Sequence, residues 1–172
     1  HEGRQVSYSG TVNSVKPRYR LAIRQRNTAV IFSGFLLNFR KGFINTSPFH
    51  DFVYVPLTTA QQQRFSFSRG DSLQFTGTFT VRNGIILIEH IRSVEVLQRG
   101  EPCFWTESRA RIAQRTGSLL PFQALQCYSC DKGVLLEVFD QQRQSSAHRK
   151  MFCLEGTTDP RWCSYRAQRL LW

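Results

Sequence analysis

Four cysteines in the last third of the chain have the residue type and spacing of a metal site. Cys127 and Cys130 stand three positions apart, and Cys153 and Cys163 follow with nine residues between them. Two thiols at the first spacing can reach one tetrahedral ion from a tight turn, and Zn²⁺ is commonly bound by four thiolates. We therefore expect a structural zinc site, because four sulfur ligands leave no open position for water.

Other uses of the same cysteines stay open. Three of the thiols could bind zinc together with His148, or the cysteines could form disulfides, since the run from Leu125 to Cys130 resembles the opening of secreted three-finger domains. A redox pair at the Cys-x-x-Cys step is a third alternative, although the βαβ pattern expected around such a motif is missing. Cys103 is the fifth cysteine, outside this set of four, and is expected to be a structural or free thiol.

The residues between the two cysteine pairs indicate a small β unit. Residues 133–140 and 149–154 read as strands, joined by a polar loop over 141–146. The segment has a turn with two cysteines, then a hairpin, then two more cysteines. This order resembles a zinc ribbon, although ribbons usually present a second Cys-x-x-Cys pair. The segment is too small to keep a core unaided, so the metal would hold it together.

Residues 5–97 read as strands, because β-branched and aromatic residues alternate with polar ones between turn signals. The strongest local signal is Asn83-Gly84, which tolerates the positive φ of a two-residue hairpin turn and joins two alternating runs. A short helix over 58–64 and a basic helix over 108–114 are also expected. The expected strands cover residues 6–15, 19–26, 29–39, 52–56, 72–82 and 85–97, with a turn at 16–18.

This succession of strands resembles the oligonucleotide/oligosaccharide-binding (OB) barrel. The resemblance rests on Gly10-Thr11-Val12, Arg69-Gly70-Asp71 and Asn83-Gly84 in strand context. An SH3-like barrel or a small sandwich would give similar alternation. A barrel followed by a ribbon is similar to replication protein A-like single-strand-binding subunits. The resemblance implies a mainly β chain with a five-stranded OB-like barrel over 1–100, a helical linker over 101–120 and a zinc-ribbon-like unit with four cysteine ligands over 121–172.

The chain carries 23 Lys and Arg against 12 Asp and Glu, a net charge of +11. Such an excess favours a polyanionic partner, above all nucleic acid. Arginines interleave with aromatic residues, the mixture that holds single strands by phosphate contacts and base stacking. We expect a DNA or RNA single-strand-binding module, with protein partners in a larger replication, telomere, repair or RNA-processing assembly. The candidate contact residues are Arg18, Tyr19, Arg20, Arg24, Arg26, Phe39, Arg40, Lys41, Phe43, Arg161, Trp162 and Arg166.

No catalytic grouping stands out in the sequence. His50-Asp51 and Glu89-His90 are adjacent pairs, and adjacent residues on a strand point to opposite faces. No phosphate-binding glycine loop and no cluster of carboxylates is present, so we expect a binding protein and not an enzyme. No apolar run of about 18 residues exists that would span a membrane.

The cysteines also bear on location. Four thiolates in a basic chain favour an intracellular compartment, nucleus, nucleoid or cytoplasm, where disulfides rarely form. Two alternative functions stay open. One is a protein-interaction scaffold, and the other is a secreted disulfide protein that binds polyanions.

Overall fold

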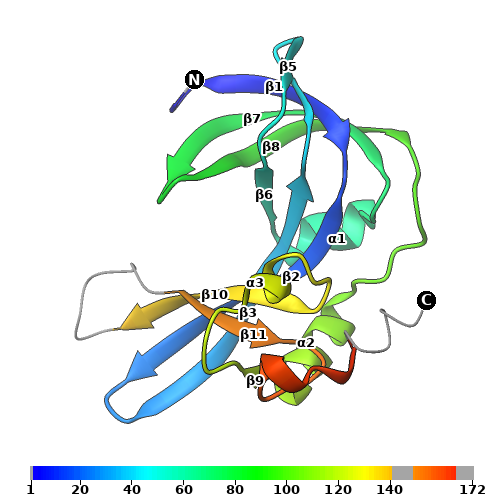
Figure 1. Cartoon of the computed structure of the whole chain (residues 1–172). Coiled ribbons are helices and arrows are strands. Elements are labelled where there is room, and N and C mark those ends of the chain that lie inside the picture. Colours follow the sequence, from blue (N-terminus) through cyan, green and yellow to red (C-terminus); the bar gives the residue numbers. More distant parts are fainter. Residues whose placement is uncertain (1, 141–148, 166–172) are drawn as a thin grey trace. The chain divides into compact units, whose positions relative to one another are not determined.

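The structure is a computed structural model that describes residues 2–140 and 149–165 (Figure 1). The chain is mainly β, as its alternation predicts. The strands are β1 (Gln5–Thr11), β2 (Ser14–Arg24), β3 (Asn27–Phe39), β4 (Gly42–Ile44), β5 (Ser47–Phe49), β6 (Val53–Leu57), β7 (Ser72–Arg82), β8 (Ile85–Gln98), β9 (Ser118–Leu119), β10 (Gly133–Asp140) and β11 (Arg149–Cys153). The helices are α1 (Thr59–Phe65), α2 (Glu107–Thr116), α3 (Leu125–Tyr128) and the 3₁₀ turn η1 (Pro160–Trp162).

Hydrogen bonding joins these strands in the order β5-β4-β1-β7-β8-β6-β3-β2-β10-β11-β9. The β6–β8 and β2–β10 pairs are parallel, whereas β1–β7, β7–β8, β3–β6 and β10–β11 are antiparallel. The described residues thus form an open series of eleven strands, more than the sequence predicts. The strands that the sequence does not predict are short: β4, β5 and β9 have two or three residues each.

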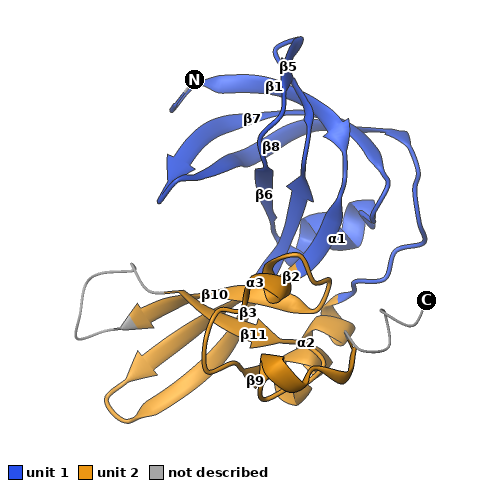
Figure 2. Ribbon diagram, viewed as in Figure 1, with its two compact units in different colours: residues 1–16, 34–106 blue, residues 17–33, 107–172 orange. Residues whose placement is uncertain are grey.

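The chain falls into two compact units (Figure 2). Unit 1 comprises residues 1–16 and 34–106, and unit 2 comprises residues 17–33 and 107–172. This division differs from the expected one, because the outer part of the β2–β3 hairpin and helix α2 belong to the unit that holds the four cysteines. The physical reason is packing. Tyr19 of β2 is buried, and its hydroxyl donates to the Ala110 carbonyl of α2 at 2.5 Å.

The start of β2 differs from the sequence prediction. The turn expected at 16–18 is wrong, because Pro17 lies inside β2, and the break between β1 and β2 falls at residues 12–13. The pairing of β2 with β10 begins only at Arg20, so that ladder needs no N–H from Pro17.

The hairpin predicted at Asn83-Gly84 is confirmed. β7 ends at Arg82 and β8 begins at Ile85, which leaves a turn of two residues. The φ angles of Asn83 and Gly84 are 51° and 74°, the left-handed values that this turn requires.

Aromatic rings fill the centre of unit 1. Tyr8, Phe39 and Phe75 are buried to 1% exposure or less, and their ring centroids lie 5.1, 5.4 and 6.0 Å apart. Such ring pairs contribute roughly 0.5–1.5 kcal/mol beyond the area they bury. Alternate residues of the strands pack around them, namely Val6, Phe35, Leu37, Val53, Val55, Leu57, Leu73 and Ile88.

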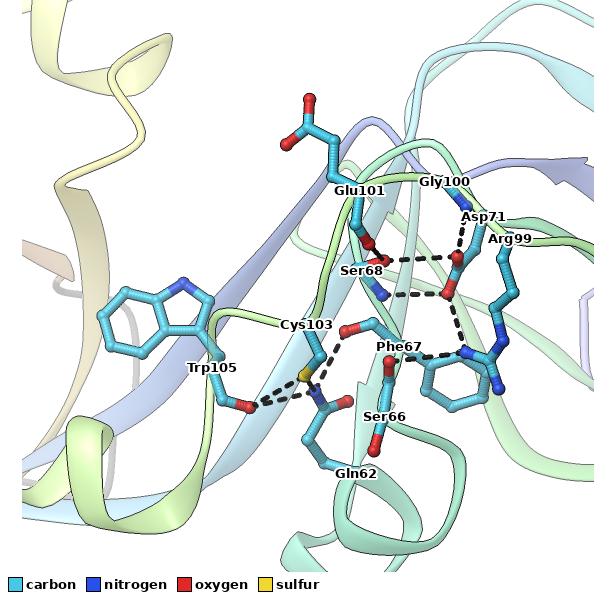
Figure 3. Close-up of polar contacts among 10 residues, drawn as sticks. All are labelled: Gln62, Ser66, Phe67, Ser68, Asp71, Arg99, Gly100, Glu101, Cys103 and Trp105. Carbon is cyan, nitrogen blue, oxygen red and sulfur yellow. Dashed lines mark hydrogen bonds and ion pairs between the residues drawn. The ribbon is translucent and has the colours of Figure 1, made fainter.

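A buried carboxylate links the start of β7 to the chain that leaves β8 (Figure 3). Asp71 is fully buried and accepts hydrogen bonds from the Ser68 and Gly100 amides at 2.9 and 2.8 Å. Arg99 Nη1 lies 3.3 Å from the Asp71 Oδ2 atom. These donors compensate a charge that would be costly to bury alone. The turn at Arg69-Gly70-Asp71 therefore has a structural role.

Helix α1 forms hydrogen bonds with residues 103–105, near the end of unit 1 (Figure 3). Thr58 caps its N-terminus, so the helix lies where the sequence predicts it. The Gln62 amide donates to the carbonyls of Phe67 and Trp105 at 3.0 and 3.1 Å, and to the Cys103 sulfur at 3.5 Å. Cys103 thus belongs to a structural contact in unit 1.

In unit 2, helix α2 covers one face of the sheet. Ala110 and Ala113 of this helix are buried, and their small side chains allow a close approach to the sheet. Beneath them, the Tyr19 ring lies 5.8 Å from that of Phe32 and 5.7 Å from that of Phe152, measured between centroids. The helix expected at 108–114 is therefore part of a core and not a linker.

Candidate functional site

The four cysteines of the predicted metal site line one small cavity of unit 2, of about 20 Å³. They come from four places in the chain. Cys127 lies in α3, Cys130 follows that helix, Cys153 is the last residue of β11, and Cys163 follows η1. A cavity of this size holds about one water-sized sphere, which is also the scale of a single metal ion.

All four of these cysteines line the cavity together. All five cysteines lie in the described part of the chain, and all five are thiols. Within residues 2–140 and 149–165, no three His, Cys, Asp or Glu side chains are grouped as they are around a bound metal. A tetrahedral zinc ion bound by four thiolates would have Zn–S distances of about 2.3 Å.

Two similar turns shape the cavity. Cys130 and Cys153 are each followed three residues later by a glycine, and the amides of Gly133 and Gly156 donate to the carbonyls of these cysteines, both at 3.2 Å. Gly156 has a φ of 77°, which favours glycine. At Gly133, a Cβ atom would lie 2.0 Å from the Cys127 carbonyl oxygen. Only glycine allows β10 to start so close to the cysteine turn.

A lysine lies beside the thiols. The Lys132 amide donates to the Cys130 sulfur at 3.4 Å. Its ammonium group is 2.9 Å from Glu155 Oε1 and 6.0 Å from the centre of the Tyr165 ring. All these residues line the cavity.

Two predicted residues lie outside the described part of the chain. They are His148, the alternative zinc ligand, and Arg166, a predicted nucleic-acid contact. Lys132 and Glu155 are neighbours of the thiols that the sequence analysis missed. The Cys-x-x-Gly step at Cys130 and again at Cys153 is the signal that could have found them, because it places both residues directly before a turn glycine.

Some of the predicted nucleic-acid contact residues are buried and others are exposed. Tyr19 and Phe39 are 1% and 0% exposed, so neither ring can stack on a base. Their prediction as contact residues is wrong, because each ring fills the core of its own unit. Phe43 and Trp162 are 50% and 83% exposed and stay available. The cationic candidates Arg20, Arg24, Arg26, Arg40, Lys41 and Arg161 are exposed, and Arg18 is partly exposed.

On β2, arginines form a row along one face. Arg18, Arg20 and Arg24 alternate with Tyr19 and Leu21, which are buried. Because successive side chains of a strand point to opposite faces, the three arginines share the face that lies away from this core. A strand rises about 3.3 Å per residue, so neighbouring arginines of the row start about 7 to 13 Å apart.

Unit 1 has a second basic and aromatic group. Arg40 and Lys41 follow β3, and Phe43 lies on β4. The Arg40 guanidinium lies 5.9 Å from the centre of the Phe52 ring, which is 51% exposed. Phe52 is a further exposed ring that the sequence analysis assigned to a strand.

The third group lies in η1 of unit 2. Asp159 accepts hydrogen bonds from the Arg161 amide at 2.9 Å and from its guanidinium at 2.6 to 3.1 Å. These hydrogen bonds lower the pKa of Asp159. The charge of Arg161 is therefore partly matched within the protein, and Trp162 beside it is the more exposed feature of this group.

No protein-family model matches the chain, and no curated protein matches its sequence. None of the helices in the described part of the chain has both the length and the apolar character of a membrane span. The cysteine cavity and the three basic groups are therefore the features from which a function can be inferred.

Proposed function

We propose that the protein is a single-strand-binding module for DNA or RNA, without catalytic activity of its own, that works with protein partners. The observation that carries this proposal is the row of Arg18, Arg20 and Arg24 on one exposed strand face. Cations in a row can follow the phosphates of a single strand, and the net charge of +11 adds long-range attraction.

We also propose that unit 1 is of the OB type. The pairing of its strands supports this: β1 pairs with β7, β7 with β8, β8 with β6 in parallel, and β6 with β3. β3 in turn neighbours β2, which follows β1 after two residues. A five-stranded Greek-key barrel has this succession of neighbours, and the loop between its first two strands is a usual binding place.

In unit 2, we propose a structural zinc ion held by Cys127, Cys130, Cys153 and Cys163 in a ribbon-like site. The shared cavity, the paired turns and the Lys132 contacts fit this donor set. Four thiolates and Zn²⁺ would carry a net charge of −2, beside which Lys132 and Glu155 form an ion pair. When bound, the ion would supply folding energy to a unit with few large buried side chains around the cysteines.

Salt-dependent titration tests the proposed function. We expect labelled single-stranded oligonucleotides to bind, with affinity falling steeply between about 50 and 200 mM salt, because phosphate contacts release counterions. Replacing Arg18, Arg20 and Arg24 by alanine should flatten the slope of log K against log salt by about 2, at about 0.7 per phosphate contact.

A control of equal net charge replaces the exposed Arg69, Arg92 and Arg109 instead. This variant should keep most of the slope, since these arginines lie outside the three basic groups. If wild-type binding is absent or insensitive to salt, the proposed function is wrong and a protein-interaction role is favoured.

A further inference from the structure

We propose that Phe139 is a base-stacking platform on the open face of the unit 2 sheet, with Arg20 and Arg24 holding the phosphates on either side of the stacked base. This inference rests on the proposed function and gives it a definite binding surface. The ligand is a single-stranded segment of DNA or RNA, because the bases of a duplex are already stacked on one another.

Phe139 is exposed where its neighbours in sequence are buried. It lies in β10 with 60% of its surface exposed, whereas Leu136 and Val138 are 0% and 7% exposed. The alternation puts Leu136 and Val138 into the core and Phe139 on the opposite face. On the same face of β10, Leu135 packs against the buried cluster of Leu120, Met151 and Cys153, whereas the Phe139 ring is exposed, so its exposure points to a ligand.

The strand register places this ring between the arginines. β10 pairs in parallel with β2, with Glu137 opposite Arg20 and Phe139 opposite Ala22. Opposite residues of paired strands point to the same face. The Arg18 guanidinium lies 3.8 Å from the Glu137 carboxylate, which agrees with this assignment of faces. Phe139 therefore lies beside Ala22, with Arg20 before and Arg24 after it on β2.

The small side chain opposite Phe139 keeps the ring open to a ligand. Ala22 extends little beyond the sheet, so a flat base can approach over it. The flanking Arg20 and Arg24 start about 7 Å away along the strand, two residues to each side of Ala22. Both are exposed and long enough to reach the phosphates next to a base that stacks on the ring.

A second apolar residue widens the same face. On β3, the neighbour of β2, Ile31 is 50% exposed while the next residue, Phe32, packs against the buried Tyr19. Ile31 thus points away from the core, to the face of Phe139. An adjacent base can lie against it, which fits a strand that crosses β10, β2 and β3 in turn.

Charge favours a polyanion over a protein as the occupant of this face. Its arginines are Arg18, Arg20 and Arg24 on β2 and Arg149 on β11, which lies opposite Glu137. Its described carboxylate on β10 is Glu137, which pairs with Arg18. A positive excess of three charges is therefore present on this face, where an apolar protein partner would need neutral neighbours.

The test compares single-strand binding by Phe139→Ala and Phe139→Trp with wild type, using anisotropy of a labelled oligothymidine. In Phe139→Ala, the loss of one stacking contact should weaken binding by roughly 5- to 150-fold. Phe139→Trp keeps an aromatic ring at this position and should bind as wild type does. The salt slope should stay unchanged in both, because no phosphate contact is lost. Phe139 is exposed, so neither variant should unfold the protein.

Phe122→Ala is the matched control, since Phe122 is a 45% exposed phenylalanine of the same unit and residues 117–126 around it contain no arginine or lysine. It should bind as wild type does. If wild type binds and Phe139→Ala binds equally well, the platform is wrong and the proposed function stands. If wild type does not bind, both fail. Equal weakening of duplex binding would also overturn base stacking.

Discussion

Two buried tyrosines differ in what their hydroxyl groups contact. The Tyr19 hydroxyl donates to the Ala110 carbonyl at 2.5 Å, whereas the buried Tyr8 hydroxyl has no hydrogen-bond partner among the described residues. Burial raises the pKa of both phenols above the ordinary value. The Tyr8 hydroxyl lies close to Gly42, because a Cβ atom added at Gly42 would be 2.4 Å from the hydroxyl oxygen.

This difference predicts opposite effects of the same substitution. Tyr19→Phe should lower the free energy of unfolding by about 1 kcal/mol, because it removes a hydrogen bond. Tyr8→Phe should leave that free energy unchanged or raise it by up to about 1 kcal/mol, because it removes a buried polar group without a partner. Urea unfolding of both variants measures this. An equal loss in both would contradict the assignment of partners.

At the scale of single elements, the turn before β10 depends on one glycine. Gly133→Ala would put a methyl group 2.0 Å from the Cys127 carbonyl oxygen, so the turn or the strand must move. We expect unit 2 to lose about 1–3 kcal/mol of stability and to bind zinc more weakly. Denaturant unfolding and metal titration measure the two effects.

Gly84→Ala provides the comparison for this variant. Nothing lies within 4 Å of a Cβ at Gly84, and only its φ of 74° disfavours alanine. The expected cost is about 1 kcal/mol, in unit 1, with zinc binding unchanged. Wild-type zinc affinity in Gly133→Ala would show that this close approach is unimportant.

Local signals in the sequence predicted most elements. The Asn83-Gly84 turn, the helix capped by Thr58 and the long alternating strands all lie where their patterns place them. These features depend on residues close together in sequence. The same holds for the cysteines in part, since Cys127 and Cys130 share a turn that their spacing indicates.

Predictions that needed long-range information were less successful. Tyr19 stands between Arg18 and Arg20, and nothing in that run reveals that Ala110, about ninety positions later, buries the ring. For the same reason the 17–33 hairpin was expected to belong to the first half of the chain. Phe139 could have been found, because alternation in the predicted strand 133–140 separates it from Leu136 and Val138.

At the scale of the whole molecule, the proposed zinc ion should stabilise unit 2 alone. Elemental analysis should find one zinc per chain, and its removal by a chelator should abolish amide protection in β10 and β11. The β2–β3 hairpin should lose protection with them, although it lies far away in sequence, because residues 17–33 belong to unit 2. The β7–β8 hairpin of unit 1 should stay protected.

Hydrogen exchange followed by mass spectrometry measures this pattern, and Cys103→Ser is the control because Cys103 lies in unit 1. It should keep the zinc. A chain without metal whose cysteines are oxidised would overturn the site and favour the secreted alternative. Loss of protection in the β7–β8 hairpin together with the β2–β3 hairpin would contradict the expectation that the ion stabilises unit 2 alone.

The assignment of residues 17–33 to unit 2 also bears on synthesis of the chain. β2 leaves the ribosome more than a hundred residues before its partner β10. At a synthesis rate of about 5–20 residues per second, roughly 5–20 s pass before the strand and helix that bury Tyr19 and Leu21 have been made. Charged residues beside an exposed apolar strand suppress aggregation. We therefore expect the arginines on the other face of β2 to limit aggregation of the chain during its synthesis.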